Sequence, residues 1–420
     1  MTVGLMIPIR SLTVKFTLFL LVFSGLSGCS NRAAVVTRSY PTVLLSKNDF
    51  VFDGGLVLPD AQSGSSSVSW SEGVIEAHDG TIYIVGNEQE DAIAQLVMPE
   101  KLTYTDSIET LPAAGEVVQP FVSVLDRLPS NRDNLDRIVG LELVNGRLIA
   151  NAVEYYDGPA DNRQTTFVIN QATDLANAEV NGLYSIAGGA RAAGWLSAVP
   201  ADWQQQLGCS HITGNSSGGP IIGRYSIGPS AYCVNLESIG QERLKKTVAT
   251  QELLSFSANY PLDEDLFNES LQNDLWTHLS QATYGFIVPG TATYATFGTS
   301  GGHRNGVGYK LSRRNGEECS GYCSNDPADN QNYYWFWDVR DLWRVALGRK
   351  AASSIRPYDW GEWTVPLSSG NVEQFKRIGG ASFDQSRKRL YFTLLDIKYD
   401  AERGVNPPAI IGYRIRGVTD

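Results

Sequence analysis

Pairs of short apolar runs joined by tight turns recur along the chain. Two such runs flank Asp79-Gly80 within residues 73–86, and two more flank Asn145-Gly146 within residues 140–151. Asp-Gly and Asn-Gly between apolar runs are typical of two-residue hairpin turns, because both turn positions need positive φ. Residues 380–392 show the same pattern with a longer turn. The pattern predicts antiparallel β-hairpins spread over most of the chain.

Each hairpin continues through a polar loop into a third apolar run, which gives a loose repeat of about 45–65 residues. The third runs are residues 94–97, 165–169 and 409–415, and a weaker fourth copy comprises residues 285–288, 291–297 and 334–339. Short antiparallel strands repeated in this way are typical of propeller blades. The length predicts an all-β β-propeller of about six or seven blades. The alternative is a β-sandwich, a fold that rarely needs so long a chain.

The two ends of the repeat are expected to meet. Residues 409–415 form a lone apolar run near the end of the chain, and residues 51–58 form another near its beginning. We expect the last run to complete a blade that the first one begins.

Two segments interrupt the strand pattern with helical features. Residues 200–208 have Pro at the start and Gly at the end, which are the preferred residues at those positions of a helix. Residues 268–281 place leucines at 271, 275 and 279 on one helical face. We therefore expect two short helical insertions. The aromatic run 333–337 is best interpreted as packing within a blade, because strand alternation buries half of its rings.

The N-terminus has the features of a secretory signal. Arg10 and Lys15 precede the apolar run 16–23, which is too short to span a bilayer as a helix. Leu26-Ser27-Gly28-Cys29 then resembles the lipobox of bacterial lipoproteins, in which the cysteine is acylated and becomes the first residue. That resemblance implies a lipid anchor on Cys29, and Ser30 after it favours the outer membrane. The alternative is an ordinary signal peptide with a chance cysteine.

This interpretation divides the chain into three parts. Residues 1–28 are the lipoprotein signal peptide, residues 29–48 a tether, and residues 49–420 a single β-propeller domain. We expect a monomer in the cell envelope whose partner through Cys29 is the lipid bilayer.

Composition excludes several classes of protein. An apolar fraction of 42% with 19% charged residues excludes a disordered chain. The formal net charge of −11 argues against a nucleic-acid partner. The signal contains two basic and no acidic residues, so its removal makes the net charge more negative still.

Four further cysteines stand at positions 209, 233, 319 and 323. An even number in an exported protein predicts disulfides. Three connectivities exist, of which we favour the local pairs Cys209–Cys233 and Cys319–Cys323. No cysteine or histidine pair has zinc-finger spacing, so we expect no metal site, and no motif indicates a cofactor.

Several segments together resemble a group of exported bacterial β-propeller-like proteins. The resemblance covers most of the chain after the signal and implies the propeller fold, but it implies no particular activity. The segments are residues 140–149, 199–204, 224–231, 319–323, 358–360 and 379–391.

Candidate site residues follow from the predicted topology. In a propeller, the loops that leave the second strand of each blade share one rim around the axis, so residues far apart in sequence converge there. The candidates in or near such loops are Glu88, Glu154, Tyr155, Arg224, His303 and Asp396. Of these, Arg224, Glu88 and Asp396 are the predicted ligand-binding residues, with Arg224 as the cation for an acidic ligand. His303, Tyr155 and Glu154 are the catalytic candidates if the protein is an enzyme.

The sequence leaves two main classes of function open. The first is a lipid-anchored propeller that binds a glycan, a peptide or a protein on one rim. The alternative is a carbohydrate-active propeller, either a polysaccharide lyase or a glycoside hydrolase; a purely structural role in the envelope is a third option. Residues 214–220 are similar to the nucleophile segment of trypsin-like proteases, but the triad order is absent, so a turn is the better interpretation. Only four histidines occur, which favours binding over catalysis.

The first prediction concerns the anchor. Cys29→Ala should abolish incorporation of labelled palmitate, because no other cysteine lies in a lipobox. The measurement is metabolic labelling of the expressed chain, with Cys209→Ala as the control that keeps the label. Persistent labelling of the Cys29 variant would contradict the lipoprotein interpretation.

Overall fold

The structure is a computed structural model that describes Met1 and residues 40–159, 161–216, 226–240, 247–314, 316–369 and 375–418. Cys29 and Arg224 lie outside the described residues, as do most of the predicted tether and residues 217–220 of the protease-like segment. None of the described helices is both long and apolar enough to pass through a bilayer.

Five sheets, here numbered blades I to V, account for most of the described strands. Blade I contains β2 (Ile75–His78), β3 (Thr81–Val85), β4 (Ala92–Val97) and β5 (Glu116–Ser123). Blade II contains β6 (Arg137–Val144), β7 (Arg147–Val153), β8 (Gln164–Ile169), β9 (Val180–Ile186) and β13 (Thr247–Val248). Blade III contains β10 (Trp195–Ala198), β11 (His211–Gly214), β12 (Ala231–Val234) and β14 (Thr250–Leu254). Blade IV contains β15 (Gln281–Ile287), β16 (Thr293–Gly301), β19 (Asn330–Asp338) and β20 (Asp359–Glu362). Blade V contains β21 (Ile378–Asp384), β22 (Arg389–Leu394), β23 (Ala409–Ile415) and β1 (Phe50–Val57).

The first strands of the blades form a closed ring. β2 contacts β6, β6 contacts β10, β10 contacts β15, β15 contacts β21, and β21 returns to β2. The fold is therefore an all-β propeller, as predicted, but it has five blades and the expected count of six or seven is wrong. Long connections at residues 98–115, 255–280 and 302–329 take up chain that the sequence repeat assigned to additional blades.

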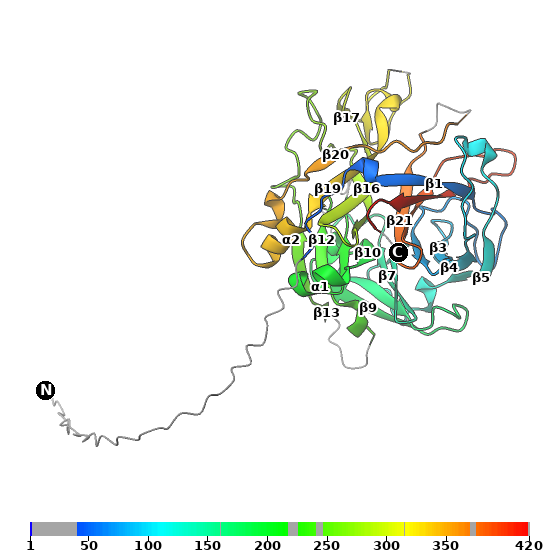
Figure 1. The fold of residues 1–420 in the computed structure, drawn as a ribbon, viewed down its shortest axis with the longest axis horizontal. Coiled ribbons are helices and arrows are strands. Elements are labelled where there is room, and N and C mark those ends of the chain that lie inside the picture. The colour runs from blue at the N-terminus through cyan, green and yellow to red at the C-terminus, as the bar shows by residue number, and fades with distance from the viewer. Residues whose placement is uncertain are drawn as a thin grey trace, which may run out of the picture. The chain divides into compact units, whose positions relative to one another are not determined.

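The N-terminal strand closes the ring. β1 pairs antiparallel with β23 as the outermost strand of blade V, which confirms the expectation for residues 51–58 and 409–415. In Figure 1 the blue β1 lies beside the red C-terminal strand. Blade V is thus assembled from both ends of the described chain.

The predicted hairpin turns are confirmed by their backbone angles. Asp79 and Gly80 have φ of 47° and 77°, and Asn145 and Gly146 have φ of 52° and 76°. These turns join β2 to β3 and β6 to β7, each with direct antiparallel pairing. The local sequence alone therefore determines the register of these two hairpins.

One predicted helix is confirmed and the other is wrong. α1 (Ala201–Leu207) lies between Pro200 and Gly208, whose φ of 80° ends the helix. Residues 268–281 instead form turns, in which the side chain of Asn273 accepts hydrogen bonds from the backbone N–H groups of Leu275 and Trp276. Such side-chain bonds compete with helical ones, and they prevail here over the leucine spacing.

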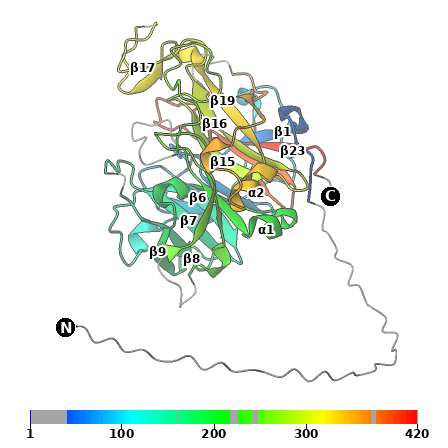
Figure 2. The ribbon, with the colours of Figure 1, turned by 90° about the vertical axis from the view of Figure 1, so that its left-hand side faces the viewer.

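Two features of blade IV complete the fold. The rings of residues 333–337 on β19 are all buried, which confirms that they pack within the blade. α2 (Val339–Ala346) follows β19 directly and was not predicted; it packs beside α1 (Figure 2). The small hairpin of β17 (Val307–Tyr309) and β18 (Tyr322–Ser324) extends from the connection between β16 and β19.

Both predicted disulfides are present. Cys209–Cys233 joins buried parts of blade III, and Cys319–Cys323 closes the connection between β17 and β18.

The second prediction compares these two bridges. Loop-closure entropy assigns about 3 kcal/mol to the 24-residue separation of Cys209–Cys233 and about 2 kcal/mol to the 4-residue separation of Cys319–Cys323. Replacing both cysteines of the first bridge by alanine should therefore lower the melting temperature more than the same change in the second. The measurement is thermal unfolding without reductant. An equal or larger loss for the shorter bridge would contradict this ranking.

Candidate functional site

One face of the ring gathers a loop from each blade. In every blade the end of the second strand, or the loop after it, contacts the segment that enters the first strand, as expected for an up-and-down order of strands. The contacts that show this are Ser71–Asn87, Asp136–Tyr155, Ala193–Asn215, Ser280–Ser300 and Arg377–Asp396. We call this side the entry face, because the first strands begin there.

An arginine joins blades V and I on the entry face. The guanidinium of Arg377 donates two hydrogen bonds to the carboxylate of Glu72, at 2.9 and 3.1 Å, and one to Asp396 at 3.0 Å. The other oxygen of Asp396 accepts a hydrogen bond from Asn406 at 3.0 Å. The predicted residue Asp396 is thus held in an ion pair rather than left open.

An exposed tryptophan lies next to this ion network. Trp70 has φ of 60°, which is a rare conformation for a bulky residue, and 44% of its surface is exposed. Its indole N–H donates to the carbonyl of Gly404 at 2.9 Å, and its ring centroid lies 5.6 Å from that of Tyr399. The backbone N–H of the predicted residue Glu88 donates to the carbonyl of Trp70. Strained backbone that presents an exposed aromatic ring points to a functional constraint.

Blade II contributes a second exposed aromatic residue. The backbone N–H of Tyr155 donates to Asp136 at 2.7 Å, and the guanidinium of Arg137 lies 5.2 Å from the centre of the tyrosine ring. Tyr155 as a whole is 65% exposed. The carboxylate of Glu154 accepts a hydrogen bond from Asn162 at 3.3 Å. Both predicted residues of this loop therefore lie on the entry face, beside a cation and an acid that were not predicted.

Asp91 connects blade I to this group. The pKa of Asp91 is raised to about 7, chiefly by burial and also by the charge of Asp136, while Arg137 and the backbone N–H of Ile138 oppose the shift. Asp91 therefore keeps its proton to a higher pH than an ordinary aspartate does, and it lies beside a second carboxylate.

His303 lies in a separate setting on blade IV. Its Nδ1 lies 2.8 Å from the carbonyl oxygen of Asn273, which can only accept, so Nδ1 carries the proton. Nε2 then accepts from the hydroxyl of Ser300 at 2.6 Å. The imidazole also stacks on Tyr333, and burial lowers its pKa. Both ring nitrogens are engaged in internal hydrogen bonds.

The structure therefore groups some of the predicted residues and separates others. Glu88 and Asp396 lie around Trp70, and Glu154 and Tyr155 lie around Asp136. His303 makes its hydrogen bonds within blade IV and its neighbouring connection. The entry-face residues that the sequence analysis missed are Trp70, Glu72, Asp91, Asp136, Arg137 and Arg377. No local motif marks them, because their proximity arises only from the closed ring.

A second acidic group lies deep in the ring. Glu76 accepts hydrogen bonds from the backbone N–H of Leu143 at 3.2 Å and from the hydroxyl of Ser382 at 2.9 Å, and burial raises its pKa to about 7. Burial also raises the pKa of Glu142, whose carboxylate lies 3.6 Å from Nε2 of His211. Burial lowers the pKa of His211 to about 4. Glu76 and Glu142 lie near the ends of β2 and β6, and His211 lies at the start of β11. These positions are at the opposite end of the blades from the entry face, so the three side chains do not belong to it.

The axis itself cannot hold a ligand. The cavity lined by all five first strands has a volume of about 10 Å³, enough for about one water molecule. Among the described residues, no group of three His, Cys, Asp or Glu side chains is placed to hold a metal ion. Within the described chain, this axial cavity therefore has no room for a sugar.

Comparisons with known proteins give only a weak likeness. No model of a known protein family matches the chain, and no curated protein matches it. The α-L-arabinanase of Cellvibrio cellulosa is similar over 82% of this chain and 91% of its own, with 11% identity and a TM-score of 0.37. A GH43 endo-arabinanase from Bacillus licheniformis is similar over 84% of this chain and 96% of its own, with 11% identity and a TM-score of 0.36. The N-terminal domain of Nup159 is similar over 90% of this chain and 94% of its own, with 10% identity and a TM-score of 0.27. The assignment of five blades therefore rests on the strand pairing described above and not on these comparisons.

The third prediction tests the shifted pKa of Asp91. Between about pH 4 and pH 7 the folded protein keeps a proton on Asp91 that the unfolded chain has lost, so the wild-type carboxyl costs stability as pH rises through this window. Asn cannot ionise and its amide oxygen can still accept from Ile138. The gain in free energy of unfolding of Asp91→Asn over wild type should therefore grow up to about pH 7 and then level off.

Urea unfolding at pH 4.5, 6 and 8 measures this difference. Glu90→Gln, which removes an exposed carboxylate from the same loop, is the matched control. A difference between Asp91→Asn and wild type that does not change with pH would contradict the proposed burial of the proton.

Proposed function

We propose that this protein is a lipid-anchored propeller of the bacterial cell envelope, attached to the outer membrane through Cys29, that binds carbohydrate on its entry face. The binding surface is the arc across blades V, I and II. Its members are Trp70, Tyr399, Glu72, Arg377, Asp396, Arg137, Asp136 and Tyr155.

The observation that carries the proposal is the pairing of exposed rings with satisfied charges. Trp70 and Tyr155 present apolar faces of the kind on which sugar rings stack. Next to them, Arg377 is neutralised by Glu72 and Asp396, and Arg137 lies between Tyr155 and Asp136. Carboxylates can accept hydrogen bonds from sugar hydroxyls, and guanidinium groups can donate to them. Because both guanidinium groups are paired and the three carboxylates of the arc outnumber them, the arc suits a neutral glycan better than an acidic one.

The fourth prediction tests this surface. Trp70→Ala and Tyr155→Ala should each weaken glycan binding at least tenfold, which corresponds to about 1.4 kcal/mol. The glycan is first identified on an array of neutral oligosaccharides, and its affinity is then measured by titration calorimetry. Tyr260→Ala is the matched control, because it removes another exposed ring from the connection between blades III and IV. Unchanged affinity in both arc variants, or an equal loss in the control, would contradict the proposal.

A second candidate function is hydrolysis of the bound glycan. The observation that favours it is Asp91, whose raised pKa of about 7 suits a general acid, beside the carboxylate of Asp136. A pair of carboxyl groups, one of which acts as the general acid, is the usual requirement for cleaving a glycosidic bond. In this scheme Asp91 protonates the leaving oxygen, and Asp136 assists the attack of water at the anomeric carbon.

Incubating the protein with the glycan that it binds, and then analysing the products, separates binding from hydrolysis. A hydrolase releases reducing ends from the bound glycan, and Asp91→Asn stops the release while binding persists. Absorbance at 235 nm, the product signal of a lyase, is not expected, because the elimination needs a uronic acid and the glycan is neutral. If the glycan binds and no product forms, the protein is a binding module.

A further inference from the structure

A groove outside the arc has the size and chemistry of a second binding site. Its volume is about 570 Å³, within the range of about 300–1,000 Å³ typical of small-molecule sites. It lies where the connection between β4 and β5 crosses blade V. The lining residues are Phe52, Asp53, Glu100, Lys101, Leu102, Tyr104, Arg389 and Arg414.

A β-bulge in β1 builds this groove. The pairing of β1 with β23 shifts between Phe52 and Gly54, so Asp53 is an extra residue in the strand. Gly54 has φ of 123°, and a Cβ there would lie 2.5 Å from the carbonyl oxygen of Thr103. That close approach lets the backbone N–H of Gly55 donate to the same oxygen at 3.0 Å. The bulge thus holds residues 100–104 against β1 as one wall of the groove.

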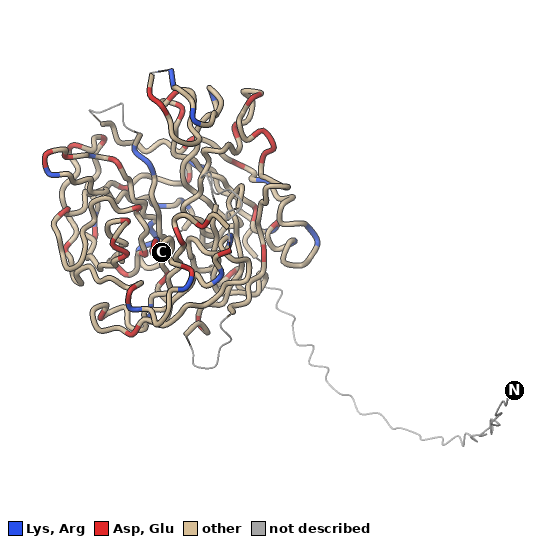
Figure 3. The backbone as a smooth tube through the Cα atoms, turned by 180° about the vertical axis from the view of Figure 1, so that it is seen from behind, with Lys and Arg blue, Asp and Glu red and all other residues tan. Residues whose placement is uncertain are grey.

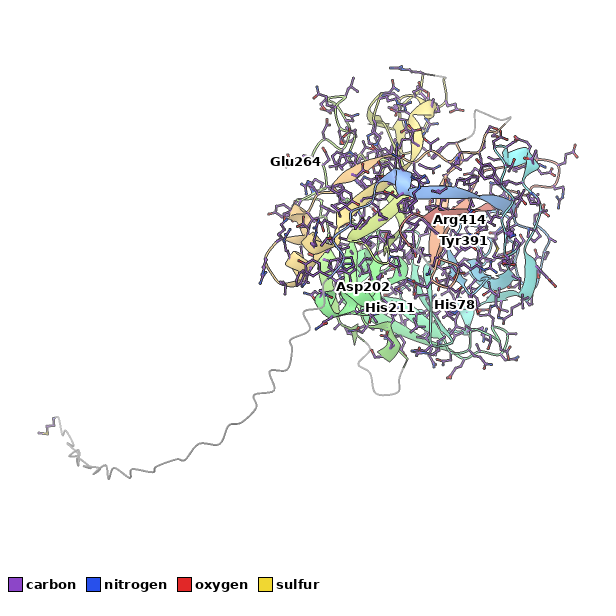
Figure 4. The ribbon with its side chains drawn as sticks, viewed as in Figure 1. His78, Asp202, His211, Glu264, Tyr391 and Arg414 are labelled. Atoms are coloured by element: carbon purple, nitrogen blue, oxygen red, sulfur yellow. A yellow bond between two sulfur atoms is a disulfide. The ribbon has the colours of Figure 1, made fainter. Side chains whose placement is uncertain are left out.

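The bulge also places one carboxylate between two arginines. Arg389 and Arg414 lie directly opposite each other on β22 and β23, an arrangement in which like charges repel. Asp53 forms an ion pair with each, at 2.5 Å to Arg389, and only 8% of its side chain is exposed. One carboxylate cannot neutralise two guanidinium groups. Arg414 keeps 70% of its side chain exposed, and Figure 4 labels it on β23, the strand that pairs with β1.

The groove therefore carries excess positive charge on an acidic protein. Exposed Lys101 adds a third cation, and the one further acid is Glu100. Acidic residues are spread widely over the loops of the described chain (Figure 3), and the formal net charge of the full sequence is −11. A local excess of cations in this setting attracts an anionic group.

The remaining lining decides the kind of anion. Tyr104 is 74% exposed, and its ring lies 5.8 Å from that of Phe52 between centroids. An exposed ring suits the face of a sugar, and the carboxylate of Glu100 can accept hydrogen bonds from hydroxyl groups but repels a simple anion. We propose that this groove binds an acidic saccharide, with a uronic-acid carboxylate on Arg414 and Lys101 and a sugar face on Tyr104. The site is independent of the arc and of its proposed function.

The fifth prediction uses three probes on the purified full chain. Hexagalacturonate and hexamannuronate are titrated by calorimetry, and fully methyl-esterified hexagalacturonate is the uncharged counterpart. We expect at least one acidic hexamer to bind and the ester to bind at least tenfold more weakly. Arg414→Gln and Lys101→Gln should each weaken the acidic hexamer at least fivefold, because each removes a cation from the groove and leaves the buried pair of Asp53 and Arg389.

Two control variants test whether the acidic hexamer binds in the groove and nowhere else on the surface. Arg344→Gln removes another exposed arginine that is also paired with an aspartate, on α2, and should leave the affinity unchanged. Trp70→Ala should also leave it unchanged, which distinguishes this site from the arc. The proposal is overturned if neither acidic hexamer binds, if the ester binds as well as the acid, or if Arg344→Gln weakens binding as much as Arg414→Gln does.

Discussion

The pairing of β1 with β23 closes the ring, and both proposed sites depend on it. Each blade buries its faces against its two neighbours, so an open ring would leave two apolar faces in water. Closure brings blade V against blade I, where Arg377 bonds to Glu72 across the junction. The same strand supplies the bulge at Asp53 that gathers the two arginines of the groove. Residues more than 300 positions apart are neighbours for this reason alone.

The two surfaces differ in how their charges are balanced. On the entry face, Arg377 meets two carboxylates in a well-aligned network, which leaves the exposed rings as the dominant open feature. In the groove, Asp53 is shared between two guanidinium groups, and the positive excess remains. We therefore propose a neutral glycan for the first surface and an acidic glycan for the second. Both assignments follow from local charge and exposed aromatic area, not from the net charge of the chain.

The buried acids near the axis have a different significance. Glu76 bonds to blades II and V at once, and Glu142 lies beside His211 of blade III. Their pKa values are raised by burial, as are those of many catalytic acids, yet the adjoining axial cavity admits no more than a water molecule. A shifted pKa alone therefore does not identify the binding site of this protein. Asp91 differs because it lies among exposed side chains of the entry face.

Features that depend on neighbours along the chain could be predicted from the amino-acid sequence. The turn at Asn145-Gly146, the helix after Pro200 and the local disulfides needed only short-range geometry. The blade count needed the lengths of the connections, which the apolar repeat does not encode. The strained Trp70 and the bulged Asp53 carry no local signal, because their partners come from segments distant in sequence. Only closure of the ring decided which side chains meet, since burial and charge pairing in a propeller arise between blades.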